Sequence, residues 1–166
     1  QFSLAVLSHA SQHPEETLVR ALDELWQRRI VREVGAGDYD FTHDRIREVA
    51  YREVSQTRRH ILHRRVAEAL EQLYAHERRK VAGQLAAHFE AAYLFDRAIT
   101  YYQEAASAAF QIYALQEVYN FCRHGLHLLN EHPLLRADIR RELKLLVMLT
   151  TVAVGIQGYG GEEVKE

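Results

Sequence analysis

Two short runs rich in β-branched and aromatic residues, with a glycine turn between them, constrain the fold of this chain most strongly. Ile30–Val34 precedes the turn Gly35–Asp38, and Tyr39–Phe41 follows it. A glycine-bearing turn between two such runs is typical of a β-hairpin. Because helical periodicity surrounds this stretch, the sequence predicts a small hairpin within a mainly α-helical protein.

The residues after the hairpin predict a helix with a polar start. Thr42 is placed to cap it, because a threonine hydroxyl can accept from a free N–H of the first turn. Asp44 adds negative charge where the helix dipole is positive. His43 then lies where free N–H groups favour an anion. One buried face is expected from Ile46, Val49, Ala50 and Val54.

The elements around the hairpin predict a winged-helix domain over residues 1–77. Phe2–Ala10 is expected to be the last part of a helix, and Pro14–Arg29 is expected to form the next helix. Two helices followed by a β-hairpin is the layout of a winged-helix domain. A longer helix over Thr57–Ala75 trails this domain, with a buried face of Leu62, Val66, Ala69, Leu70 and Leu73.

Residues 78–166 predict a second, purely helical domain. Alanines and aromatic residues recur at helical spacing and no strand signal occurs. Helical hairpins in series are typical of an α-solenoid. The expected helices are Arg79–Tyr93, Asp96–Tyr113, Leu115–Asn130 and Leu134–Ile156.

Composition restricts the class of protein. The formal net charge is -2, which argues against a generally basic nucleic-acid binder. Cys122 is the one cysteine, so a disulfide framework is excluded and a cytoplasmic, reducing location is expected. The most apolar stretch, Leu143–Ile156, is too short to span a bilayer, so no membrane association is expected. The first residue, Gln1, is not an initiator methionine, and Glu162–Glu166 resembles the first turn of a helix that does not continue. We therefore expect a fragment that is truncated at both ends.

Catalytic and metal-binding patterns are missing from the sequence. The histidine pairs His60/His63 and His124/His127 have i, i+3 spacing, but two ligands do not complete a zinc site. No nucleophile has a recognisable partner arrangement, and Cys122 is expected in or near the core. The sequence therefore predicts a non-enzymatic regulatory or binding segment.

The helical half resembles the tetratricopeptide repeat in its small and aromatic positions. These positions are Leu85, Ala86, Phe89, Ala98, Tyr102 and Ala105. The same pattern of positions recurs about twenty residues later, at Val118, Cys122 and Gly125. In the tetratricopeptide family the repeat is roughly 34 residues long. Either the repeat is degenerate, or the middle helix serves two neighbours. A plain helical bundle is the alternative.

Across its whole length the chain resembles the region that follows the nucleotide-binding core in STAND-type signalling ATPases. The matching segments are Leu22–Val31, Tyr39–Glu48, Leu62–Glu71 and Val152–Val164. This family includes large bacterial regulators with LuxR-type or cyclase outputs. The resemblance implies a winged helix followed by a tetratricopeptide-like α-solenoid.

The resemblance also implies a nucleotide-sensing role for two residues. The family's winged helix carries a Met-His-Asp motif, and Thr42-His43-Asp44 matches it with threonine in place of methionine. His43 would sense the β-phosphate of ADP, and Asp44 would support the local geometry. No P-loop occurs in this sequence. ATP or ADP is therefore expected as a cofactor of the full-length protein, and none of this fragment alone.

The expected function is to couple nucleotide state to protein–protein interaction in transcriptional or second-messenger regulation. Protein partners or neighbouring domains would bind through the helical repeats. A dimer through exposed C-terminal helices is also expected, with an apolar patch that includes Leu146, Leu149 and Val152. The alternative is a DNA-binding winged helix with a helical dimerisation tail. Acidic residues on Pro14–Arg29, the candidate reading helix, argue against direct DNA binding.

Overall fold

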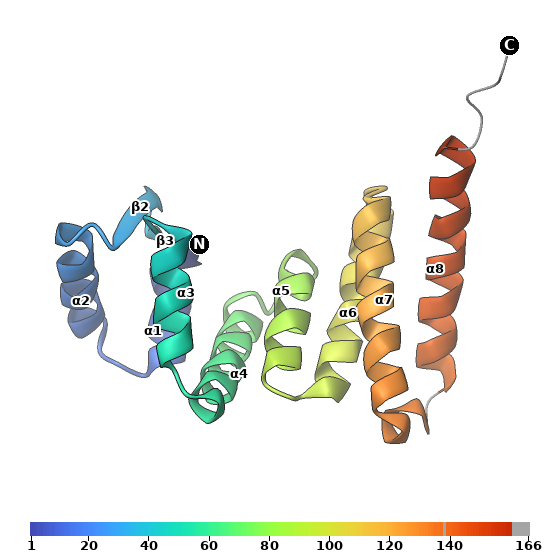
Figure 1. The fold of residues 1–166 in the computed structure, drawn as a ribbon, viewed down its shortest axis with the longest axis horizontal. Coiled ribbons are helices and arrows are strands. Elements are labelled where there is room, and N and C mark those ends of the chain that lie inside the picture. Colours follow the sequence, from blue (N-terminus) through green and yellow to red (C-terminus); the bar gives the residue numbers. More distant parts are fainter. Residues whose placement is uncertain (138, 161–166) are drawn as a thin grey trace, which may run out of the picture. The chain divides into compact units, whose positions relative to one another are not determined.

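The computed structural model describes residues 1–137 and 139–160, with side chains described for 1–135 and 139–153. The chain is mainly α-helical, with a small three-stranded antiparallel sheet (Figure 1). It divides into two compact units, Gln1–Ala75 and the residues from His76 onward. The predicted helical turn at Glu162–Glu166 lies outside the described residues.

The first unit contains a three-stranded sheet and four helices. Strand β3 is central, and β1 and β2 pair with it on either side. The strands are β1 (Phe2–Ser3), β2 (Val31–Gly35) and β3 (Asp38–Phe41), and the helices are α1 (Leu4–Ser11), α2 (Glu15–Gln27), α3 (Asp44–Glu53) and α4 (Gln56–Leu73).

The predicted hairpin is confirmed as β2 and β3. Gly37 has φ 82°, the left-handed turn geometry that glycine adopts without steric cost. The expectation that Phe2 belongs to a helix is wrong, because its backbone pairs with Tyr39 in the sheet. The Phe2 ring lies 6.0 Å from the Tyr39 ring and 6.3 Å from the Phe41 ring. This aromatic contact favours the extended conformation at the start of the chain.

The core of the first unit is small. Helix α1 packs on α4, and α2 packs on β2. The buried apolar side chains are Ala10, Leu18, Leu22, Val31, Ala67, Ala69 and Leu70. The predicted face of α4 is confirmed at Ala69 and Leu70 but is wrong at Leu62 and Leu73, each of which is 37% exposed. Helix α1 covers only part of the apolar surface of α4.

The predicted buried face of α3 is wrong. No residue of α3 is buried, and Val49 is 53% exposed. Ala50 is also exposed, whereas Ile46 and Val54 are partly covered. Within the first unit α3 packs chiefly against the short strand β3, so the described residues of this unit leave its apolar side largely uncovered.

The second unit is a series of antiparallel helices in which each packs against the next. Its elements are α5 (Arg78–Ala91), α6 (Phe95–Gln111), α7 (Leu115–Glu131), the 3₁₀ helix η1 (Pro133–Ala137) and α8 (Ile139–Gly160). The expected start of the last helix at Leu134 is wrong. Pro133 begins a tighter 3₁₀ turn, in which Leu135 N donates to His132 O at 2.9 Å.

Two equivalent turns explain the repeat of about twenty residues in this unit. Tyr93 and Tyr113 each follow a helix in the left-handed region, with φ of 60° and 59°. In both turns the next backbone N–H reaches back into the helix, from Leu94 to Phe89 O and from Ala114 to Ala109 O. Helix α6 lies between these turns and packs against both α5 and α7. Helix α6 is therefore the shared packing partner of two neighbouring helices.

The core of the second unit is built from small residues and a few large side chains. All six positions that carry the tetratricopeptide resemblance are buried. A Cβ added to Gly125 would lie 2.8 Å from Leu145 Cδ1, so α7 and α8 approach closely here. The side chain of Gln103 donates to Arg141 O at 2.8 Å and connects α6 to α8. These contacts define how successive helices stack.

Candidate functional site

His43 lies at the start of α3, as predicted, but the details of the cap differ. His43 itself is the N-cap residue, and its carbonyl accepts from Ile46 N at 3.0 Å. The prediction that Thr42 caps the helix is wrong, because no side chain caps α3 and Thr42 Oγ1 is buried without a partner. Thr42 lies one residue before the cap, and its N–H donates to Ile30 O at 3.0 Å.

The imidazole of His43 is exposed and has no hydrogen bond or ion pair in the described part of the chain. Asp44 is also exposed, and its carboxylate lies 3.2 Å from the guanidinium of Arg47. The first N–H groups of α3 have no acceptor within the helix. His43 is therefore free to bind an anion at this helix end.

An apolar hollow lies beside His43. Its volume is about 520 Å³, and its lining comes from α3 and the residue before it. The lining residues are His43, Arg45, Ile46, Val49 and Ala50. The hollow therefore combines an apolar floor with a histidine and an arginine at its edge.

The other end of α3 is held to α4 by a polar contact that sequence reasoning missed. Tyr51 Oη lies 3.1 Å from His63 Nε2, and the guanidinium of Arg59 lies 4.8 Å above the Tyr51 ring. Burial lowers the pKa of His63, and the nearby charges of His60 and Arg59 lower it further. The contact joins residues twelve positions apart, and no local periodicity signals such a pair.

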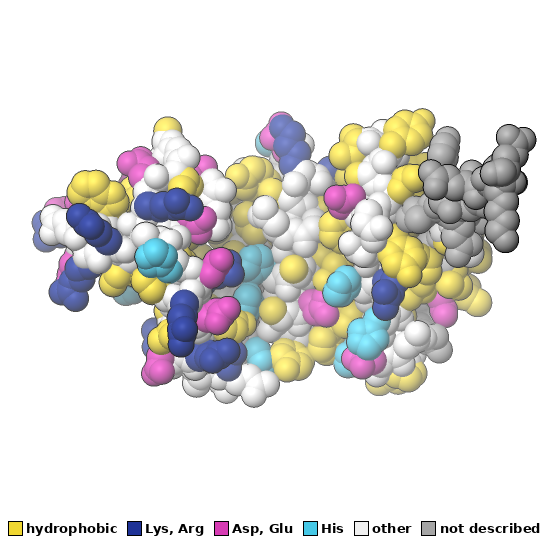
Figure 2. All heavy atoms as spheres, turned by 45° about the horizontal axis from the view of Figure 1, so that its top comes forward, with side chains coloured by type: hydrophobic (Ala, Val, Ile, Leu, Met, Phe, Trp, Pro, Cys, Tyr) yellow, Lys and Arg dark blue, Asp and Glu magenta, His cyan; other side chains and the backbone are white. Residues whose placement is uncertain are grey.

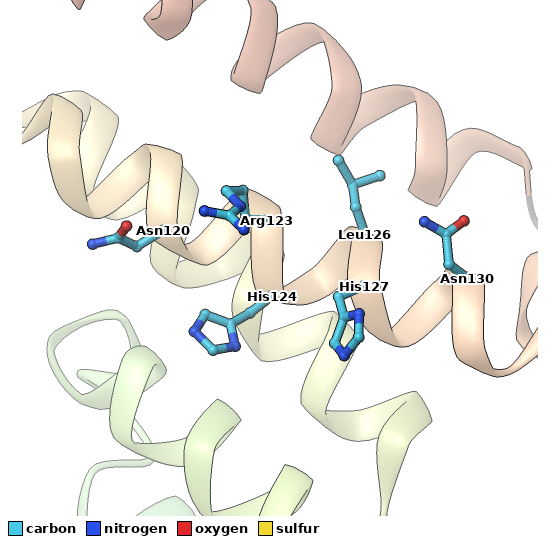
Figure 3. Close-up of a pocket in the computed structure, with 6 residues that line it drawn as sticks. All are labelled: Asn120, Arg123, His124, Leu126, His127 and Asn130. Atoms are coloured by element: carbon cyan, nitrogen blue, oxygen red, sulfur yellow. The ribbon is translucent and has the colours of Figure 1, made fainter.

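A second candidate site lies along α7 in the other unit. A groove of about 490 Å³ is lined by Asn120, Arg123, His124, Leu126, His127 and Asn130. Figure 3 shows His124 and His127 leaving α7 on one side, and Leu126 and Asn130 on the other. The histidine pair noted in the sequence thus faces one side of α7.

Helices α5, α6 and α7 meet in a polar cluster beside this groove. Tyr102 Oη donates to the Glu90 carboxylate, and His124 Nδ1 lies 3.9 Å from the same oxygen of Glu90. The rings of Tyr102 and His124 stack at 5.3 Å. Burial and the Glu90 carboxylate raise the pKa of Tyr102 above its usual range. The pattern of small and aromatic residues singled out Tyr102, but no sequence pattern indicated that Glu90 lies beside the Tyr102 hydroxyl.

Cys122 is fully buried, as expected for a core thiol. Burial raises its pKa to about 11. A thiol with this pKa carries little thiolate at neutral pH and is a poor nucleophile. Within the residues that the structure describes, no group of three or more His, Cys, Asp or Glu side chains could hold a metal ion.

The predicted C-terminal apolar patch is only partly correct. Leu146 is 42% exposed, but Val152 is buried, at 1% exposed. The side chains that do form an exposed apolar stripe on α8 are Ile139, Leu143, Leu146 and Val147. No helix in the described ranges is long and apolar enough to span a membrane.

Comparison with known proteins finds a distant relative. An uncharacterised protein of Rhizobium meliloti (strain 1021) is 29% identical over 137 residues, which is 81% of this chain. The match covers 13% of that relative, so the chain spans only a small part of its length. No family model matches the chain, and no solved structure matches it.

Proposed function

We propose that this chain is the winged-helix and repeat-scaffold portion of a multidomain signalling ATPase of the STAND type. In this function the first unit senses the nucleotide bound by an adjacent ATPase domain. The helical unit, a tetratricopeptide-like α-solenoid, binds a protein partner or a neighbouring domain. The fragment itself is not catalytic. ATP or ADP is the cofactor of the full-length, cytoplasmic regulator of transcription or second-messenger output.

The observation that carries the proposal is the position of His43. Its imidazole is exposed and free of partners in the described residues, and it lies at a helix N-terminus beside a hollow. Imidazole can donate a hydrogen bond to phosphate, and the helix end adds N–H donors and a positive dipole. The much greater length of the relative also agrees with a segment that works within a large protein.

The helical unit supplies a surface for a protein partner. The α7 groove carries amide, imidazole and guanidinium groups, which are the donors and acceptors that an extended peptide needs. His124 lies 3.9 Å from the Glu90 carboxylate of α5, and its ring stacks on that of Tyr102 of α6. A partner bound along α7 would therefore meet a pre-arranged set of polar groups.

The test begins with the full-length gene. A P-loop encoded upstream of Gln1 supports the proposal, and a complete upstream sequence without one refutes it. In the full-length protein, His43→Ala should weaken ADP retention and raise basal output, because a phosphate contact is lost. His13→Ala is the matched control, since His13 is an exposed histidine outside the hollow. Normal ADP affinity and basal output in His43→Ala would exclude the sensing role.

A DNA-binding winged helix is the second candidate. Four arginines of α3 and α4 favour it, because they have no ion pair in the described residues: Arg45, Arg52, Arg58 and Arg65. Acidic side chains accompany the basic ones on the visible face of this unit, which weakens attraction to phosphates (Figure 2). Salt-dependent binding of the isolated chain to duplex DNA would favour this function.

A further inference from the structure

The hollow on α3 has a second polar side chain besides His43. Its volume is about 520 Å³, and both His43 and Arg45 contribute to its lining. The other lining residues are apolar: Ile46, Val49 and Ala50. Arg45 is exposed and forms no ion pair in the part of the chain that the structure describes. An anion that reaches His43 in this hollow therefore meets one further charged donor, the guanidinium of Arg45.

The place of Arg45 in α3 brings it close to His43. His43 is the N-cap residue, and Arg45 is the second residue of the helix that follows it. In a helix every Cα–Cβ bond is tilted toward the N-terminus, so a long side chain at this position leans toward the end where His43 lies. The first backbone N–H groups of the helix are free at the same end. Imidazole, guanidinium and backbone donors are thus available at one end of α3.

The acidic side chains of the first two turns of α3 decide how an anion can be held there. Asp44 is engaged by Arg47, whose guanidinium lies 3.2 Å from its carboxylate. Glu48 is exposed and does not line the hollow. With Arg45, these turns carry two acidic and two basic side chains and hence no net charge. Recognition of an anion therefore depends on direct hydrogen bonds from Arg45 and His43, and not on a basic field.

A buried hydroxyl at the same helix end supports a functional site there. Thr42 directly precedes His43, and its Oγ1 is buried without a hydrogen-bond partner in the described structure. Nearly all buried polar groups in folded proteins are paired, and an exception calls for an explanation such as a functional role. Chains accept unfavourable local choices of this kind chiefly at functional sites. This observation is independent of the exposed charges on α3.

A guanidinium and an imidazole can share one terminal phosphate group. The guanidinium is a planar fork that donates two parallel hydrogen bonds to two oxygens of the same phosphate. An imidazole N–H donates one hydrogen bond and can reach a remaining oxygen. A terminal phosphate exposes enough oxygens for both donors, whereas a phosphate that links two groups exposes fewer. The pair of side chains therefore suits the end of a phosphate chain.

We infer that Arg45 is a second phosphate contact of the nucleotide site, and that it makes the site selective for a nucleoside diphosphate over a monophosphate. The inference rests on the proposed function, in which His43 contacts the β-phosphate of ADP. Arg45 binds the same terminal phosphate through its guanidinium fork. A nucleoside monophosphate has no β-phosphate, so it gains nothing from Arg45. Arg45 is thus a specificity-determining residue of the sensor.

Titration calorimetry of the full-length protein with ADP and with AMP tests the inference. Arg45→Gln should weaken ADP binding by about tenfold or more, because a charge-assisted contact is lost. Its affinity for AMP should stay within about twofold of the wild type, which is well below the loss expected for a charged hydrogen bond. Arg45→Lys should recover part of the ADP affinity, since an ammonium keeps the charge but not the fork. The exposed position of Arg45 leads us to expect unchanged urea unfolding in both variants.

Arg52→Gln is the matched control, because Arg52 is an exposed arginine of the same helix that does not line the hollow. It should bind ADP as the wild type does. If His43→Ala weakens ADP binding but Arg45→Gln does not, the inference about Arg45 is overturned and the proposed sensing function stands. If neither variant changes ADP affinity, both are overturned. Equal losses for ADP and AMP in Arg45→Gln would also overturn the inference, because the contact would then not be to the β-phosphate.

Discussion

Gly125 is the position where the stacking of helices can be tested most sharply. A methyl group there would lie 2.8 Å from Leu145 Cδ1 and 3.6 Å from Tyr102 Cβ. Leu145 is fully buried, so its side chain has little room to move. Overpacking of this kind costs about 1–3 kcal/mol, whereas replacing a helical glycine by alanine gains up to about 1 kcal/mol. Gly125→Ala should therefore destabilise the second unit by about 1 kcal/mol.

A double-mutant cycle separates the clash from the change in helix propensity. Leu145→Ala alone should cost about 2–5 kcal/mol, because it leaves a cavity. In the double variant the methyl group added at position 125 fills part of that cavity, so the two changes together should cost at least about 1 kcal/mol less than their sum. Additive costs would refute the close contact between α7 and α8.

The assay follows each unit separately during urea unfolding. Trp26 is the one tryptophan and lies in α2, so its fluorescence reports on the first unit and should not change in Gly125→Ala. Far-UV circular dichroism should show the loss of stability. Gly83→Ala is the matched control: its added Cβ meets the end of the Phe121 ring at 2.9 Å. Phe121 is only partly buried, so its whole side chain has room to shift away from the added methyl group, and this variant should be close to neutral.

Three further changes test the backbone, the titratable groups and the core thiol. Tyr113 is 83% exposed at φ 59°, so Tyr113→Gly should stabilise the second unit by about 0.5–1 kcal/mol in urea unfolding, whereas Tyr113→Ala should not. The pKa of His63 is lowered in the folded state, so its contribution to stability should fall as pH drops through about 6.5; His63→Gln should flatten that dependence in a pH series of unfolding curves. Cys122, with a pKa raised to about 11, should react with thiol reagents only when the second unit opens, and Gly125→Ala should accelerate that reaction.

The elements that local signals define could be predicted from the sequence. The glycine turn predicts the hairpin, and helical periodicity predicts α2 and the helices from α4 to α7. Strand β1 could not be predicted, because Phe2 pairs with Tyr39 across a long stretch of chain. A two-residue strand has no periodicity of its own. Its conformation depends on a partner that only the folded chain supplies.

The candidate sites show a second limit of sequence reasoning. The pattern of Ile46, Val49 and Ala50 correctly indicates that α3 has an apolar side, but periodicity does not reveal whether another element covers that side. Likewise, the spacing of His124 and His127 places them on one side of a helix. The carboxylate of Glu90 comes from a different helix, and its distance to His124 depends on tertiary packing.

Replacing Thr42 tests whether its hydroxyl caps α3 or is a buried group without a partner, because the two interpretations predict opposite changes in stability. If its hydroxyl capped α3, Thr42→Val would destabilise the first unit by about 0.5–2 kcal/mol. In the structure Thr42 Oγ1 is buried without a partner, and removing such a group should instead stabilise by about 1 kcal/mol. Ser3→Ala is the control, since Ser3 Oγ accepts from Val6 N at 3.2 Å and caps α1, so it should cost about 1 kcal/mol. Urea unfolding followed by Trp26 fluorescence measures both variants, and a loss of stability in Thr42→Val would restore the capping role to Thr42.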